Sequence, residues 1–140
     1  MKDQQAFLRA LETLALPASG FDLRLRLFAA WAYRRRYPAR EAAARCAMSL
    51  SRNARAQGRA EDYHHTLTMA LLAILYSRIA SQPILAEDWD AFLAANPDIV
   101  ADAWKVALEH YSEDKLQQEE ARKVFLEPDR KPLPTGCLLH

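Results

Sequence analysis

Apolar residues recur at steps of three and four along most of this chain, the spacing that puts them on one face of an α-helix. Proline, glycine and an Asn-Pro pair separate the segments that carry this pattern. The pattern predicts a short helix over residues 87–93 and six longer helices, over residues 4–15, 20–36, 38–56, 62–81, 98–111 and 112–124. The side chains predicted to cap helix N-termini are Asp3, Asp62, Asp98 and Ser112.

The segments 20–36 and 62–81 do not show a simple amphipathic pattern. Residues 21–27 alternate strictly between apolar and polar, which by itself is typical of a β-strand. They run into residues 28–36, which do not alternate, and no partner strand is visible, so the prediction is one helix over 20–36. The middle of the 62–81 segment is apolar nearly all round, which indicates a helix buried on most sides.

The composition also favours helices over strands. Ala and Leu dominate over the β-branched residues, and the chain has only three glycines with which to build hairpins. At 140 residues the chain has the size of one ordinary domain. The prolines beyond residue 127 exclude a helix interior or an inner strand there. The prediction is an all-α, single-domain bundle of about six helices over residues 1–126, with an extended, proline-rich tail over 127–140.

Charge is unevenly distributed along the chain. The net charge is +1, but residues 21–60 carry ten Arg against two acidic residues, a sum of +8, and residues 61–140 sum to −7. The two halves could pair within the fold, across a homodimer, or with an anionic partner, although solvated faces are the usual fate of such charges. No helix-turn-helix or stacking-aromatic motif accompanies the arginines at 34–36, so no nucleic-acid partner is expected.

Three further observations bear on the setting of the protein. The first residues lead directly into an amphipathic pattern, so no secretory signal is expected. The longest apolar run, over residues 67–76, is shorter than the roughly 18 residues that a membrane-spanning helix needs. Cys46 and Cys137 form neither a disulfide framework nor a thiolate cluster. We expect a cytoplasmic protein with no membrane partner.

The stretch at residues 62–68 gathers the side chains best suited to chemistry. His64 and Thr68 lie four residues apart and share a helix face, whereas His65 points about 100° away. An inward His64 beside a hydroxyl could act as a general acid or base. The alternative is a structural histidine near a helix start, fully satisfied by hydrogen bonds.

Adjacent histidines do not provide the three-residue or four-residue step of helical metal ligands, so neither a metal nor another cofactor is expected. Aromatic side chains, among them Trp31 and Tyr63, could line an apolar pocket for a small molecule. The alternative is that these aromatic residues are simply part of the core.

A set of spaced residues suggests a relationship to other proteins. The set consists of Tyr63-His64-x-Thr66-x-Thr68, Tyr111-Ser112, Leu116, Ala121-Arg122-x-x-Phe125-x-x-Pro128-Asp129 and Pro132-Leu133-Pro134. It resembles a family of small, uncharacterised bacterial helical proteins with the pattern YHxTxT … YS … L … AR..F..PD..PLP. The resemblance covers most of the chain and implies a helical protein of bacterial origin, without a named function.

The resemblance also implies candidate site residues. Members of the family carry two histidines, three residues apart, just before a Leu-x-x-Ala-Trp stretch, which here is Leu27 to Trp31. The matching positions hold Leu23 and Arg26, and an arginine there favours an anionic ligand over a metal ion. Carried over by position, the candidates that remain are His64, Thr68, Arg122 and Asp129.

These observations lead to two hypotheses. In the first, the protein binds a small, anionic organic ligand near the start of the central helix, with His64 and Thr68 as catalytic residues if it is an enzyme. Arg26, Tyr63, Trp31 and Arg122 would then bind the ligand. In the second, the protein is a non-enzymatic interaction or regulatory module that acts through dimerisation or protein docking. A cavity beside His64 would favour the first, and a packed interior with a large exposed apolar patch the second.

Overall fold

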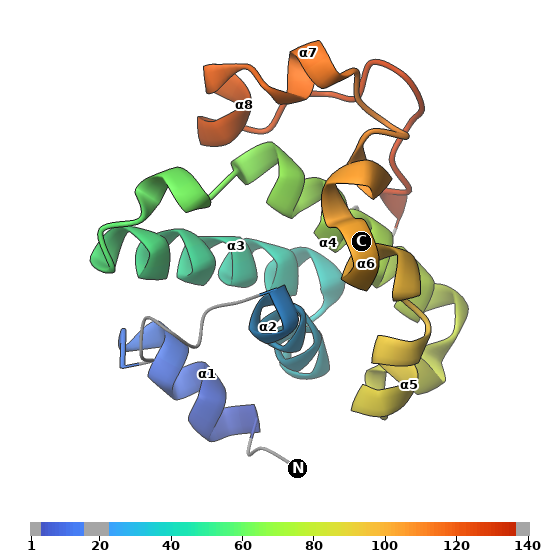
Figure 1. The fold of residues 1–140 in the computed structure, drawn as a ribbon. Helices are drawn as coiled ribbons and strands as arrows, with labels where there is room; N and C mark the ends of the chain where they lie inside the picture. The colour runs from blue at the N-terminus through green and yellow to red at the C-terminus, as the bar shows by residue number, and fades with distance from the viewer. Residues whose placement is uncertain (1–3, 16–22, 137–140) are drawn as a thin grey trace.

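The computed structural model describes residues 4–15 and 23–136, and within them it contains helices and no strand, which confirms the all-α class. Figure 1 shows α1 and the α7–α8 pair at opposite ends of the molecule, with α2, α3 and α4 between them. The helices are α1 (Gln4–Glu12), α2 (Leu23–Arg36), α3 (Ala39–Ala56), α4 (His65–Ser81), α5 (Trp89–Ala94), α6 (Pro97–Ala107), α7 (Glu113–Leu116) and α8 (Glu119–Lys123). Short 3₁₀ turns, η2 (Ala60–Asp62) and η3 (Pro83–Ala86), precede α4 and α5.

Helix α2 is enclosed by four elements, because α1, α3, η3 and α5 all pack against it. Its residues 27–33 are buried without interruption, so the alternating pattern at 21–27 leads into a helix covered on every side. Trp31 donates from Nε1 to the Leu85 carbonyl (2.9 Å), and the Tyr76 hydroxyl donates to the Ala30 carbonyl (2.7 Å). These two hydrogen bonds tie α2 to η3 and to α4. Residues 20–22 of the predicted helix lie outside the described residues.

Helix α3 faces α2 with small side chains, which allow the two helices to approach closely. Cys46 lies in this interface, and burial raises the pKa of its thiol to about 12. Gly58 follows the helix with φ +69°, a left-handed conformation that glycine adopts without steric penalty. The predicted helix stop at Gly58 is therefore confirmed.

The start of α4 differs from the prediction. Asp62 does not cap this helix: it ends the η2 turn and pairs with Arg59, with 2.7 Å between Arg59 Nε and Asp62 Oδ2. The next two residues are extended, and His64 occupies the N-cap position, where its side chain accepts a hydrogen bond from the Leu67 backbone N–H. Histidine is not among the favoured N-cap residues, so this role could not be predicted from the sequence.

The C-terminal third also departs from the prediction. Asn96 and Pro97 begin α6, and Asp98, the expected cap, instead accepts two hydrogen bonds from Arg78 at 2.9 and 2.8 Å. Asp102 interrupts α6 with an extended backbone. Ser112 does cap α7, as predicted, but the expected 112–124 helix is divided into α7 and α8. The described residues therefore form eight α-helices and not about six.

Residues 124–135, which we call the C-terminal strap, contain no helix or strand. The strap is fastened by side chains of the bundle. Thr66 Oγ1 donates to the Val124 carbonyl (2.8 Å) and accepts from the Leu126 N–H (3.1 Å). The Tyr111 hydroxyl donates to the Leu126 carbonyl (2.6 Å). Leu133 is the one buried apolar side chain among residues 124–135.

Candidate functional site

His64 occupies the junction between α4 and α7. Its Nδ1 accepts a hydrogen bond from the Leu67 N–H (3.0 Å), and its Nε2 lies 2.8 Å from the Leu116 carbonyl oxygen. Because a carbonyl only accepts, Nε2 carries the proton and donates, which fixes a single neutral tautomer. The ring is buried and meets Trp104 edge-on, with 5.8 Å between ring centroids.

The electrostatic setting keeps this imidazole neutral. Burial lowers the pKa of His64 below its ordinary value, and the positive charge of Arg122 lowers that pKa further. Both ring nitrogens are already engaged in hydrogen bonds with the backbone. A proton transfer at His64 would therefore have to break a bond that holds α4 or α7 in place.

A small cavity adjoins His64. Arg26, Tyr63, His64 and Thr68, all predicted as site residues, line this inner cavity together with Asp62, Leu50, Ala54 and Leu67. Its volume is about 40 Å³. At roughly 10–15 Å³ for one water, that volume admits a few water molecules and no organic ligand. The Thr68 hydroxyl donates to the His64 carbonyl (2.8 Å), a hydrogen bond within the first turn of α4.

A larger depression shares Tyr63 with the inner cavity. This outer groove is open to solvent, has a volume of about 610 Å³, and is lined by Ser51, Arg55, Ala60, Glu61, Tyr63, Glu119, Arg122 and Lys123. Arg122, predicted as a ligand-binding residue, enters it from α8, and Arg55 enters it from α3. Tyr63 lines both the groove and the inner cavity. The outer groove, unlike the inner cavity, has the volume of a small-molecule site.

The charged side chains of the outer groove are of both signs. Lys123 lies 3.9 Å from Glu119 in a highly exposed ion pair, which contributes little to stability. Within the described residues, the side chains of Arg55 and Arg122 make no hydrogen bond or ion pair. Three cationic residues against two glutamates leave the groove with a net charge of +1. Its charge balance favours an anionic ligand.

Tyr63, which lines both the outer groove and the inner cavity, is hydrogen-bonded to the imidazole ring of His65. Its hydroxyl lies 2.7 Å from His65 Nδ1. Burial raises the pKa of Tyr63 to about 12, so that the phenol is neutral at pH 7. Burial also lowers the pKa of His65, and the neighbouring His64 lowers it further. Both groups are neutral hydrogen-bonding partners at physiological pH.

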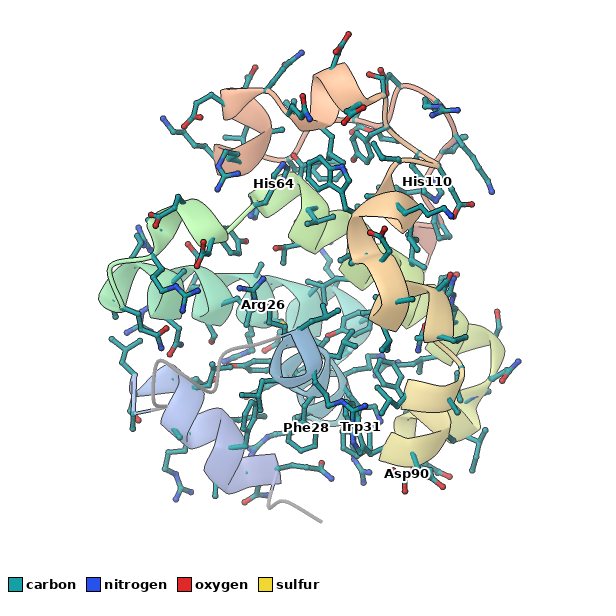
Figure 2. All side chains as sticks on the ribbon, in the orientation of Figure 1. Arg26, Phe28, Trp31, His64, Asp90 and His110 are labelled. Carbon is teal, nitrogen blue, oxygen red and sulfur yellow. The ribbon has the colours of Figure 1, made fainter. Side chains whose placement is uncertain are left out.

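The remaining candidates lie elsewhere. Trp31 is fully buried among Phe28 and Trp89, with centroid separations of 5.7 and 5.5 Å, and it lines neither the inner cavity nor the outer groove. Figure 2 shows Trp31 and Phe28 at the opposite end of the molecule from His64. Asp129 accepts hydrogen bonds from the Ser112 N–H (2.7 Å) and hydroxyl (2.6 Å), which lower its pKa. Trp31 is thus a core residue, and Asp129 fastens the strap.

Sequence reasoning missed three residues of the outer groove that bear on binding, Ser51, Arg55 and Lys123. Ser51 and Arg55 lie one turn apart on the exposed side of α3, and this i, i+4 step was the signal available. Lys123 directly follows Arg122 in the chain. Nothing in the sequence indicated that residues of α3 and α8 would line one groove together with Tyr63.

No group of three or more His, Cys, Asp or Glu side chains among the described residues is placed to hold a metal ion. No helix in that part of the chain is long and apolar enough to cross a membrane. Comparison of the chain with protein-family models, with curated proteins and with solved structures finds no match.

Proposed function

We propose that the protein binds a small anionic organic molecule in the outer groove. The observation that carries this proposal is the pair Arg55 and Arg122, which two separate helices bring to one open groove without an ion pair inside the described fold. Guanidinium groups bind carboxylates and phosphates through paired hydrogen bonds. Two such groups at one groove provide a recognition site for a ligand with one or two anionic groups.

The glutamates of the groove restrict the ligand further. Glu61 and Glu119 line the same space as the arginines, so a ligand with hydroxyl or ammonium groups beside its anionic group can satisfy both sets of side chains. A purely anionic ligand would face repulsion from these carboxylates. Small hydroxy acids, amino acids and phosphate monoesters are therefore the classes we favour.

In this proposal His64 senses the ligand and does not transfer a proton. Arg122 lowers the pKa of His64 through its positive charge. An anion bound to Arg122 would offset that charge and raise the pKa of His64 toward its ordinary value. Titration of the His64 ring by NMR, with and without a ligand, therefore reports occupancy of the outer groove.

The test is a thermal-shift screen with succinate, glutamate, malate, phenyl phosphate and inorganic phosphate. A ligand present at 100 times its Kd stabilises the folded state by about 2.7 kcal/mol. We expect at least one of the organic anions to raise the Tm of the wild-type protein and to have no effect on Arg122→Met. Lys105→Met, which removes an exposed cation from α6, is the matched control and should respond like the wild type.

An equal response in Arg122→Met would contradict the proposal, and so would a panel to which the wild type shows no response.

The second candidate function is an interaction module that acts through dimerisation or protein docking. It is favoured by the outer face of α3, where Met48 is 64% exposed between Arg45 and Arg52. Sedimentation velocity over a range of protein and salt concentrations tests it. A salt-sensitive dimer that Arg52→Glu dissociates would support this function, and a monomer at all concentrations would leave only docking to another protein. In both proposals the protein is bacterial and is located in the cytoplasm.

A further inference from the structure

A second depression lies between α4 and the C-terminal strap. This strap groove has a volume of about 390 Å³ and is lined by Met69, Ala73, Phe125, Glu127, Pro128, Pro132, Leu133 and Thr135. It shares no residue with the outer groove or the inner cavity. Most of its surface is apolar, and its volume is that of a site for a small molecule.

Polar contacts on both sides of the groove fix the position of the strap. At the start of the strap, Thr66 and Tyr111 hold the backbone of Val124 and Leu126. Farther along the strap, the Arg130 N–H donates to the His110 carbonyl (2.9 Å), and His110 Nδ1–H donates to the Lys131 carbonyl (3.0 Å). The strap therefore spans the distance between two anchors.

The apolar side chains of the strap are not fully packed at this groove. Leu133 is 8% exposed, but Phe125, which also lines the groove, is 38% exposed. Phe125 could bury more of its surface by packing against α4. The backbone hydrogen bonds of the strap instead hold it at the edge of an open space. A groove that the fold holds open is preorganised for a ligand, because little conformational entropy is lost when the ligand binds.

The charge at the groove selects the class of ligand. Glu127 is the one charged residue among those that line it. The cation nearest in sequence on the strap, Arg130, directs its guanidinium to the Leu108 carbonyl (3.1 Å). Burial raises the pKa of the Tyr111 hydroxyl, and the negative charges of Glu127 and Asp129 raise it further, which indicates a negative potential at this end of the strap.

We propose that the strap groove binds an apolar molecule that carries a protonated amine. The carboxylate of Glu127 would pair with the ammonium group, and the ring face of Phe125 attracts the same cation. Met69, Ala73 and the proline rings would enclose the apolar body of the ligand. This site is independent of the proposed function of the outer groove.

Three probes of nearly equal size test the proposal: phenethylamine, 2-phenylethanol and 3-phenylpropanoate. Each is titrated into the ¹⁵N-labelled full-length protein, and amide chemical shifts are followed. We expect phenethylamine to bind most tightly and to shift the amide signals of Met69, Ala73 and Leu133. Because an exposed ion pair is weak, Glu127→Gln should reduce its affinity by about threefold to fivefold, to the affinity of the alcohol.

Glu120→Gln removes an exposed carboxylate from α8 that does not line the groove, and it should leave phenethylamine binding unchanged. Equal affinities for all three probes, an unchanged affinity in Glu127→Gln, or no shift at Met69, Ala73 and Leu133 would each overturn the proposal. Binding of 3-phenylpropanoate in the outer groove would be recognised by shifts at Arg55 and Arg122. The proposals for the strap groove and for the outer groove are therefore tested independently.

Discussion

The junction at His64 and the outer groove are neighbours, since Tyr63 lines both the groove and the cavity beside His64, but they use their polar groups in opposite ways. At the junction, both ring nitrogens of His64 bind the backbone, one within α4 and one on α7. In the groove, the guanidinium groups of Arg55 and Arg122 make no such contact with the described residues. The difference teaches that the histidine expected to act in catalysis has both ring nitrogens engaged by the fold, whereas the arginines, for which we propose a ligand, retain unused hydrogen-bonding capacity.

The largest effect should follow from His64→Ala. Loss of the helix cap costs about 1 kcal/mol, and the unsatisfied Leu116 carbonyl costs about a further 1–3 kcal/mol. We therefore expect the free energy of unfolding, measured by urea denaturation, to fall by about 2–4 kcal/mol. His64→Asn, which can still cap the helix, should lose less. A loss below about 0.5 kcal/mol in His64→Ala, the usual range for a surface substitution, would return His64 to the list of functional candidates.

Thr66→Val tests the fastening of the strap. The threonine hydroxyl serves both the Val124 carbonyl and the Leu126 N–H, and valine satisfies neither. We expect a loss of about 1–3 kcal/mol and faster hydrogen exchange at the Leu126 amide. The control is Thr13→Val, because the hydroxyl of the exposed Thr13 donates to a carbonyl of the preceding turn (2.7 Å). An equal loss in both variants would show that the strap depends little on Thr66.

The pH dependence of stability follows from the lowered pKa of His64. In the unfolded chain the imidazole regains a pKa of about 6.5, so below that pH the unfolded state binds more protons than the folded state. The free energy of unfolding should therefore decrease as the pH falls from 7 to 5, and His65, whose pKa is also lowered, contributes in the same direction. The decrease should be smaller in His64→Asn. An identical slope in the variant would assign the pH dependence to other groups.

The smallest effect on stability should come from the groove itself. Arg55→Met and Arg122→Met remove side chains that form no ion pair within the described fold, so each should change the free energy of unfolding by at most about 0.5 kcal/mol. Urea denaturation of both variants measures this directly. A loss comparable to that of His64→Ala would mean that the groove residues support the fold, and the contrast between the two regions would disappear.

The sequence predicted the first four helices well because each is long enough for its apolar period to stand out. It failed where side chains from distant segments decide the backbone. The division of the 112–124 segment into two helices coincides with a hydrogen bond from His64 to the Leu116 carbonyl, and Thr66 holds the residues that follow α8. No local pattern contains such contacts.

The candidate site could be predicted only in part. Helical spacing placed His64 and Thr68 together, and the family resemblance drew attention to Arg26, which lines the same inner cavity. Neither could show that the cavity holds only a few waters. The family-like pattern includes Thr66, Tyr111 and Ser112, whose side chains fasten the strap or hold Asp129, so much of the pattern serves the fold. The outer groove depends on the packing of α8 against α4, which brings Arg122 to a groove that Arg55 enters from α3, and the sequence does not encode this contact locally.

The central claim, that the fold itself uses both nitrogens of His64, can be tested most directly by ¹⁵N NMR of the labelled imidazole. We predict one neutral tautomer, with the proton on Nε2, which persists below pH 6.5 in the wild-type protein. In Arg122→Met the pKa of this ring should rise. A ring that titrates at or above pH 6.5, with both neutral tautomers populated, would contradict the account and make His64 available for proton transfer.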